Sequence, residues 1–266
     1  ARHGYLDRRA LPGAVVVDDG AVPVRRLLRN EWFFLALIVA IGAALRFGGI
    51  AHSSIWHDEG FTTFLMDRSP AQIIDATARD VHPPLYYLFL HYWTEIFGRS
   101  EVAVRGLSAV FGLGTITLAY GIMRRLIGRE AGLVAALAVA LAPFLVRYSQ
   151  EARMYGQVAF FAALSTYAFV RGVQEKLWRW WALYALSLAA AIYTQYYGIL
   201  VVIGHAAYVG VRLIWLEPKA KRREGLREAA QFGVGVLGAL LLFRPWVPIL
   251  LEQVGRVSGS YGIQQS

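Results

Sequence analysis

The sequence predicts an all-α polytopic membrane protein built from apolar helices that are joined by short loops. Hydrophobic residues make up 57% of the 266 residues and charged residues 17%, and the mean hydropathy is +0.44. Seven apolar runs approach the roughly 17 to 25 residues that an α-helix needs to cross a bilayer. These runs lie near Trp32–Ile50, Val102–Met123, Ala131–Val146, Met154–Val170, Leu177–Tyr193, Tyr197–Leu216 and Ala229–Leu251.

The net charge of +9 comes largely from basic residues in the loops between these runs. Loops rich in Lys and Arg alternate with other loops, and such basic loops remain on the cytoplasmic side of a membrane. We therefore expect an integral protein of the cytoplasmic membrane with a cytoplasmic N-terminus, a lipid bilayer around it and no nucleic-acid partner. The basic segments are Arg25–Arg29, Arg124–Arg129, Arg171–Arg179 and Lys219–Arg227.

This topology divides the chain into three parts. Residues 1–31 form a polar cytoplasmic arm, residues 32–251 the transmembrane module, and residues 252–266 an extracytoplasmic tail that we expect to lead into a further C-terminal part. The chain has no cysteine, which excludes disulfides and thiolate metal sites.

The first outer loop, residues 51–82, is expected to contain short helices that lie along the membrane surface. Ser69-Pro70-Ala71-Gln72 is a capping box with Pro at the first helical position, which predicts a helix start. A second short helix fits Phe61–Met66. The apolar, aromatic segment 84–97 follows, but counting it as a crossing would invert every later loop. We predict that it is re-entrant or surface-lying.

Two adjacent carboxylates, Asp58 and Glu59, follow the first apolar run. Charge at a membrane boundary indicates a functional site, because an unpaired carboxylate in hydrocarbon would cost several kcal/mol or become protonated. Asp58 alone also suits the structural role of an N-cap for the next short helix. No cofactor is certain, but oxygen ligands suit Mg²⁺ or Mn²⁺, so a divalent cation at Asp58 or Glu59 stays open.

Three basic side chains belong to the same predicted outer face. His82 precedes two prolines that fix the backbone, where it is either a site residue or a solvated histidine in a turn. Arg153 offers a planar fork that suits a phosphate, or it forms a salt bridge with Glu151. Arg105 lies four residues after Glu101, so an i,i+4 helix pair is its structural interpretation.

Two glycine patterns indicate close helix packing rather than a binding site. Gly233–Gly238 matches the dinucleotide pattern G-x-G-x-x-G, yet it lies inside an apolar run and no strand precedes it. Small residues let transmembrane helices approach each other closely, and Gly128 with Gly132 is expected to do the same near a helix end.

Four motifs in order carry a family resemblance. They are Trp-x-Asp-Glu-x-Phe at 56–61, His-Pro-Pro-Leu-Tyr-Tyr at 82–87, Phe-Gly-x-Ser-Glu-x-x-x-Arg at 97–105 and Tyr-Ser-Gln-Glu-Ala-Arg-Met-Tyr at 148–155. The set resembles the polyprenyl-phosphate-sugar-dependent glycosyltransferases of the GT-C superfamily, in the protein mannosyltransferase and aminoarabinose transferase branch called glycosyltransferase family 39. This resemblance implies a GT-C-like module of seven transmembrane helices, with amphipathic surface helices in the first outer loop.

The resemblance also implies an inverting transferase that moves a sugar from a polyprenyl phosphate to an acceptor hydroxyl at the extracytoplasmic face. Asp58 is then the base that takes the acceptor's proton, and Glu59 positions the base or the acceptor. Arg153, His82 and Arg105 are the candidate cations for the donor phosphate. The supporting residues expected near them are His57, Tyr148, Gln150, Glu151 and Tyr155.

Two other classes of protein compete with this interpretation. A transporter needs polar groups along a path across the spans, whereas the polarity here is concentrated at one face. A noncatalytic GT-C-like subunit that assembles with a larger membrane complex is the main alternative. The sequence does not specify the sugar, the length of the lipid, or whether the acceptor is a protein, a lipid or a glycan.

Overall fold

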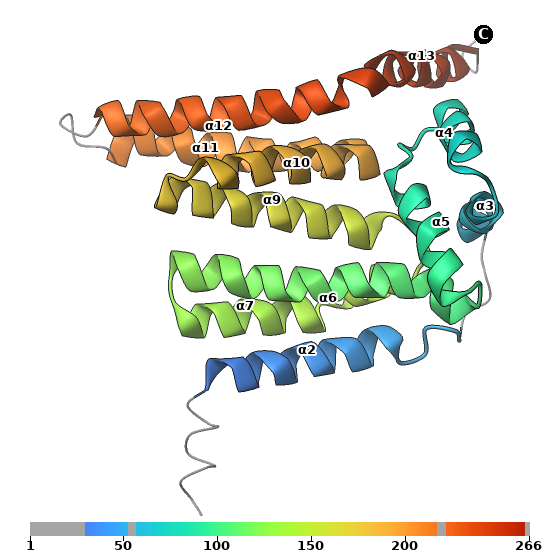
Figure 1. Ribbon diagram of the computed structural model, residues 1–266, viewed down its shortest axis with the longest axis horizontal. Coiled ribbons are helices and arrows are strands. Elements are labelled where there is room, and N and C mark those ends of the chain that lie inside the picture. Colours follow the sequence, from blue (N-terminus) through green and yellow to red (C-terminus); the bar gives the residue numbers. More distant parts are fainter. Residues whose placement is uncertain (1–29, 53–56, 217–221, 264–266) are drawn as a thin grey trace, which may run out of the picture.

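The computed structural model describes residues 30–52, 57–216 and 222–263, and within these residues the regular elements are all helices, joined by turns, without a strand (Figure 1). The all-α prediction is confirmed. Most of the predicted cytoplasmic arm, residues 1–31, lies outside the described residues. The helices are α2 (Glu31–Phe47), α3 (His57–Met66), α4 (Pro70–Arg79), α5 (Leu85–Phe97), α6 (Glu101–Leu126), α7 (Arg129–Leu141), α8 (Pro143–Ser149), α9 (Tyr155–Glu175), α10 (Trp178–Thr194), α11 (Val201–Val211), α12 (Arg222–Phe243) and α13 (Val247–Ile263), with short turns η1 (Tyr196–Leu200), η2 (Arg212–Leu216) and η4 (Arg244–Trp246).

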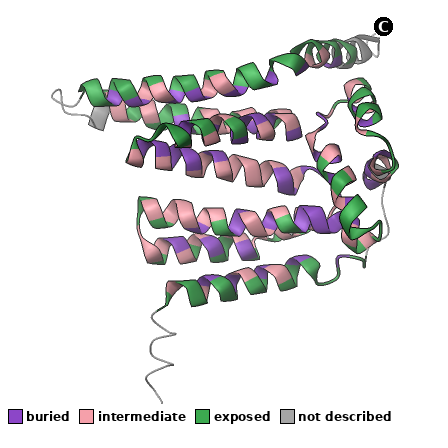
Figure 2. Ribbon diagram, in the orientation of Figure 1, coloured by how far each residue is buried: buried purple, intermediate pink, exposed green. Residues whose placement is uncertain are grey.

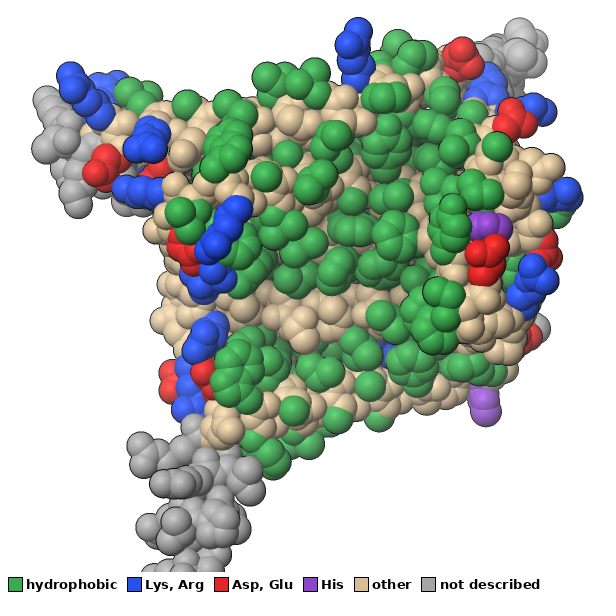
Figure 3. Space-filling model, in the orientation of Figure 1, with side chains coloured by type: hydrophobic (Ala, Val, Ile, Leu, Met, Phe, Trp, Pro, Cys, Tyr) green, Lys and Arg blue, Asp and Glu red, His purple; other side chains and the backbone are tan. Residues whose placement is uncertain are grey.

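The long helices lie side by side, and α3, α4 and α5 gather at one end of the bundle (Figure 1). Hydrophobic side chains form a broad band between two ends that carry most of the charge (Figure 3). Three helical stretches are long and apolar enough to cross a membrane: α6, residues 196–214, and residues 222–256. The bent pair of α7 and α8 makes a fourth if it is one span. The seven crossings and their orientation stay predictions.

Buried side chains line the surfaces where the helices meet (Figure 2). One buried cluster joins α9, α10 and α12 around Trp181, Tyr184 and Phe169. A second cluster, which includes Tyr86 and Met154, packs α3, α4 and α5 against the start of α6 and the turn before α9. This second cluster fixes the end of the bundle where the predicted site residues lie.

The outer-loop predictions are confirmed at the level of secondary structure. Ser69 caps α4 as expected: its Oγ accepts the N–H of Gln72 at 3.4 Å, and the Gln72 side chain accepts the N–H of Ser69 at 3.1 Å. The predicted short helix 61–66 is part of the longer α3. Segment 84–97 contains α5, which packs on α3 and α6.

The predicted run Ala131–Val146 forms two helices instead of one straight helix. The chain breaks between α7 and α8 with a bend of 59°. Pro143 causes the break because it has no N–H to donate to the carbonyl of Val139. The buried Arg46 of α2 supplies the missing donors, with Nη2 at 3.1 Å from Val139 O and Nη1 at 3.1 Å from Ala140 O.

The predicted run Ala229–Leu251 is also interrupted. α12 begins earlier, at Arg222, and ends at Phe243, where the 3₁₀ turn Arg244–Trp246, which contains Pro245, leads into α13. Helix α13 then continues through the predicted tail as far as Ile263. Pro lacks the N–H that a continuous α-helix needs, which explains the interruption.

The glycine predictions are confirmed in part. A Cβ on Gly235 would lie 2.9 Å from the ring of Tyr184, so this glycine lets α12 approach α10 closely. Gly132 is similarly tight, because its Cβ would lie 3.0 Å from Tyr120. Gly128 acts differently: it precedes α7 with φ of 146°, a backbone conformation that favours glycine.

Candidate functional site

The structure pairs Glu59 of α3 with Arg105 of α6 in a buried ion pair. Arg105 Nε donates to Glu59 Oε1 at 2.9 Å, and Nη2 donates to Oε2 at 2.6 Å. The Arg105 side chain is 4% exposed and the Glu59 side chain 1%, so water screens the pair little. Glu101, the partner that sequence spacing suggested, lies 3.9 Å from Arg105 and is a weaker second contact.

The same pair ties several separate segments together, including the turn after α2 that contains Ile50. Glu59 Oε1 also accepts the N–H of Ala152 at 2.7 Å, and Arg105 Nη1 donates to the carbonyl of Ile50 at 2.8 Å. The first turn of α3, the start of α6 and the turn before α9 are therefore joined by charge-assisted hydrogen bonds. This arrangement holds α3 in a fixed position relative to the turn that carries Arg153.

Arg153 itself is buried beside α6 and α5. Its carbonyl accepts the hydroxyl of Ser108 at 3.0 Å, and Ser108 Oγ lies 3.1 Å from the hydroxyl of Tyr86. A Cβ on Gly156 would lie 2.8 Å from Ser108 O, so this glycine permits the close approach of α9 to α6. The Arg153 guanidinium lies 5.8 Å from the ring of Tyr155, within range of a cation–π contact.

His82 belongs to the same neighbourhood through Asp80. His82 Nδ1 lies 2.9 Å from Asp80 Oδ2, and both side chains are partly buried. Burial alone would raise the pKa of Asp80. Hydrogen bonds from His82 and from the N–H of Val81, with the charges of His82 and Arg153, hold that pKa below its usual value. Ser108 links the segments of the two predicted cations, because its hydroxyl contacts both the Arg153 carbonyl and the hydroxyl of Tyr86, four residues after His82.

Four of the predicted supporting residues have structural contacts. Gln150 Nε2 donates to the carbonyls of Leu45 at 2.9 Å and Gly48 at 3.1 Å, so it caps the end of α2. Glu151 pairs with Arg147 at 3.4 Å. The ring of Tyr148 lies 4.5 Å from the ring of Tyr155.

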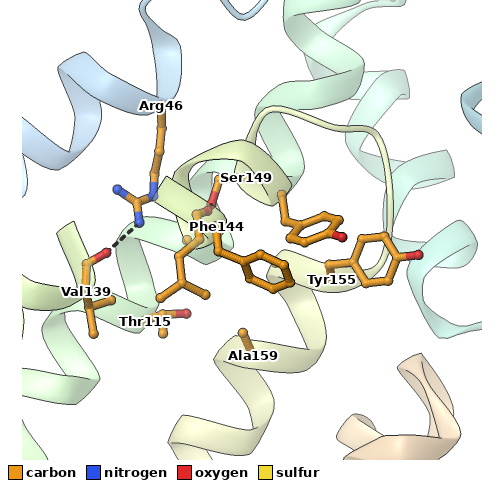
Figure 4. Close-up of a pocket in the computed structure, with 11 residues that line it drawn as sticks. Arg46, Thr115, Val139, Phe144, Ser149, Tyr155 and Ala159 are labelled. Atoms are coloured by element: carbon orange, nitrogen blue, oxygen red, sulfur yellow. Dashed lines mark hydrogen bonds between the residues drawn. The ribbon is translucent and has the colours of Figure 1, made fainter. Parts of the chain in front are cut away.

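Arg46 and Gln150 connect the same two segments in opposite directions. It caps the broken end of α7, while Gln150 just after α8 caps α2, so the two segments hold each other. A cavity of about 140 Å³ lies beside this contact, with Arg46 at one side and the rings of Phe144 and Tyr155 beyond it (Figure 4). The lining is otherwise mainly apolar. We call the mutual capping of α2 and α7–α8 the Arg46–Gln150 clasp.

Asp58 and His57 lie in the first turn of α3, and their side chains are outside the described residues. Within the described ranges, no three His, Asp or Glu side chains come together as a metal site would require. Both oxygens of Glu59 are already engaged by Arg105, and one also accepts Ala152 N–H. The Glu59 carboxylate is therefore occupied by donors of the protein itself.

Sequence reasoning missed several residues of this site. Asp80 was not among the predicted site residues, although its spacing of two residues from His82 was a usable signal. Arg46 carried a stronger signal, since a charge within an apolar run indicates a specific partner. Ser108 and Tyr86 gave no signal, because a hydroxyl in a helix is compatible with many environments.

Comparison with known proteins gives one match. The family model described as dolichyl-phosphate-mannose-protein mannosyltransferase matches residues 81–249, a segment that includes Arg105, Arg153 and His82. No curated protein and no solved structure matches the chain.

Proposed function

The chain belongs to the dolichyl-phosphate-mannose-protein mannosyltransferase family and is a glycosyltransferase of the GT-C type, and from this premise we propose that it uses a polyprenyl-phosphate-linked sugar. The acceptor hydroxyl belongs to a protein, a lipid or a glycan. The reaction takes place at the end of the bundle that carries α3, α4 and α5, which the charge pattern assigns to the extracytoplasmic face.

The observation that carries this proposal is the buried link of Glu59, Arg105 and Ala152. It fixes the first turn of α3, which contains Asp58, against the turn that contains Arg153. A base and a phosphate-binding cation have to be held at a defined separation, because proton removal and departure of the phosphate belong to one displacement. The contacts of Glu59, Arg105 and Ala152 support such a fixed separation, and neither Asp58 nor Arg153 supplies a side chain to those contacts.

In the proposed reaction, the acceptor oxygen forms a bond to the anomeric carbon of the sugar. Asp58 takes the acceptor's proton. The bond between the anomeric carbon and the phosphate oxygen breaks, and its electron pair leaves with the polyprenyl phosphate. Arg153 and His82 stabilise the negative charge that develops on that phosphate. Attack opposite the leaving group inverts the anomeric configuration.

The contacts of Arg105 support a positioning role in place of the phosphate contact that the resemblance suggested. Its Nε and Nη2 bind Glu59, and its Nη1 binds the Ile50 carbonyl. A phosphate would have to displace a buried carboxylate to gain the same donors. Glu59 is likewise engaged, which supports Asp58 over Glu59 as the base.

The deciding experiment is transfer of a radiolabelled sugar from a polyprenyl-phosphate donor by the purified protein in liposomes. Asp58→Asn should lower the rate by about 10²- to 10⁴-fold, because it removes the base while leaving the side-chain size nearly unchanged. Asp75→Asn, on the exposed face of α4, is the matched control and should keep wild-type activity.

Two results would contradict the proposal. Wild-type turnover in the Asp58→Asn protein at saturating donor and acceptor removes Asp58 as the base. Absence of transfer by the wild-type protein with any polyprenyl-phosphate sugar, in the presence of candidate acceptors, favours the noncatalytic subunit instead.

A further inference from the structure

Asp80 has a contact that the proposed reaction does not explain. Its Oδ2 lies 2.9 Å from His82 Nδ1, within the range of a charge-assisted hydrogen bond. In the part of the chain that the structure describes, the other ring nitrogen, Nε2, makes no hydrogen bond. The carboxylate thus fixes the ring through one nitrogen and leaves the other for a ligand.

The backbone around this pair is held from both sides. Gln253 of α13 donates to the carbonyl of Thr77 at 2.9 Å, and Arg256 donates to the carbonyl of Ala78 at 2.7 Å, so α13 caps the last turn of α4. On the other side, Pro83 and Pro84 are buried and restrict the chain as it enters α5. A short segment between a capped helix end and two prolines has little freedom to move.

The Asp80 side chain is not needed to end α4. The backbone N–H of Asp80 already bonds to the carbonyls of Ala76 and Thr77, both at 3.2 Å. Its carboxylate is therefore available for another task. The charged or titratable groups that influence it electrostatically are His82 in the same segment, which it contacts, Arg153 from the turn before α9, and Tyr196 of η1.

We propose that Asp80 is a positioning residue for the donor phosphate: it accepts Nδ1–H of His82 and thereby directs Nε2–H toward a phosphate oxygen next to Arg153. This inference rests on the proposed function and deepens it. A ring that donates to a carboxylate and to a phosphate at once is an imidazolium, so the donor site has two cations. Asp80 acts through His82 and does not contact the donor.

The test is binding of farnesyl phosphate, a short polyprenyl monophosphate, to the purified full chain in nanodiscs at fixed pH and ionic strength. Asp80→Asn and His82→Gln should each raise Kd by about tenfold, the usual size of a lost charge-assisted hydrogen bond. The double variant should be no weaker than His82→Gln alone, because Asp80 works only through that ring. Asp75→Asn is the control and should bind like the wild-type protein.

Two further variants complete the design. Arg153→Ala reports on the phosphate site independently of Asp80 and should weaken binding. Asp80→Glu keeps the negative charge with a longer reach, so it should recover part of the affinity that Asp80→Asn loses. It also keeps the test usable if the Asn protein folds poorly.

The outcomes separate this inference from the proposed function. If Asp80→Asn weakens binding equally in the wild-type and His82→Gln backgrounds, Asp80 acts independently of His82, and the inference is overturned while the donor proposal stands. Wild-type affinity in Asp80→Asn has the same meaning. If the wild-type protein does not bind farnesyl phosphate, or if Arg153→Ala binds it equally well, the donor site itself is misassigned and both proposals fail.

Discussion

The buried pair of Glu59 and Arg105 predicts a large loss of stability when its charge is removed. Glu59→Gln keeps the shape of the side chain but replaces a carboxylate, which accepts three donors, with an amide. Those donors are Arg105 Nε, Arg105 Nη2 and Ala152 N–H, at 2.9, 2.6 and 2.7 Å. The amide accepts through one oxygen only and turns its own N–H groups toward the guanidinium.

The expected magnitude follows from burial. Removing one partner of a buried ion pair typically costs about 3–5 kcal/mol, because the other charge is left uncompensated. Glu101 provides a matched control within the same site, since it is a carboxylate on the same Arg105. It is 42% exposed and lies 3.9 Å away. Glu101→Gln should therefore cost roughly 0–1 kcal/mol, as exposed pairs do.

The measurement is the free energy of unfolding of purified variants in mixed micelles, titrated with a denaturing detergent. Glu59→Gln should lose several times more stability than Glu101→Gln. Similar small losses for both would mean that water reaches the pair, and the argument that it fixes α3 would then be wrong. Arg105→Lys separates the two roles of Arg105: a positioning role predicts lost stability, whereas a phosphate contact predicts a higher KM for donor at normal stability.

The remaining predictions concern Arg153, the topology and pH. Arg153→Lys should raise the KM for donor, because an ammonium loses the planar fork, while Glu151→Gln should have a smaller effect; equal, negligible effects in initial-rate measurements would retire the phosphate role. Since the chain has no cysteine, Asp75→Cys should react with a membrane-impermeant thiol reagent in intact cells and Ile127→Cys should not; the reverse pattern would refute the topology. The lowered pKa of Asp80 means that its ionised form stabilises the fold fully above the unfolded pKa of about 3.9. This contribution is lost as the pH falls through the folded pKa, so the stability gap between wild type and Asp80→Asn should shrink on acidification, and a constant gap would contradict it.

The helices were predictable because their signals are local. A capping box begins α4, and apolar runs of membrane length coincide with the long helices. The two breaks were not predicted, although Pro143 and Pro245 are visible in the sequence. Each proline lies in a strongly apolar run, and the hydropathy of the whole run predicts one membrane-spanning helix. A break at the proline becomes predictable only when another residue is known to bind the carbonyl that the proline leaves without a donor.

The site was predictable in composition but not in its pairing. Glu59 and Arg105 were both chosen as site residues, yet they lie 46 positions apart. Helical spacing therefore favoured the local partner Glu101. The alternative that joined Arg153 with Glu151 also fails, because Glu151 pairs with Arg147, one helical turn earlier. Local charge spacing identifies possible partners, but burial selects among them, and burial depends on how distant helices pack.

The site is made from loops and helix ends, which are usually the mobile parts of a fold. Two contacts between distant segments limit that mobility. The Arg46–Gln150 clasp fixes the turn that leads to Arg153, and Gln253 with Arg256 fixes the end of α4 that leads to His82. The two candidate phosphate cations thus depend on opposite ends of the chain. Because displacing a reacting group by about 1 Å can cost about 10²-fold in rate, substitutions in either contact should lower transfer without touching a substrate.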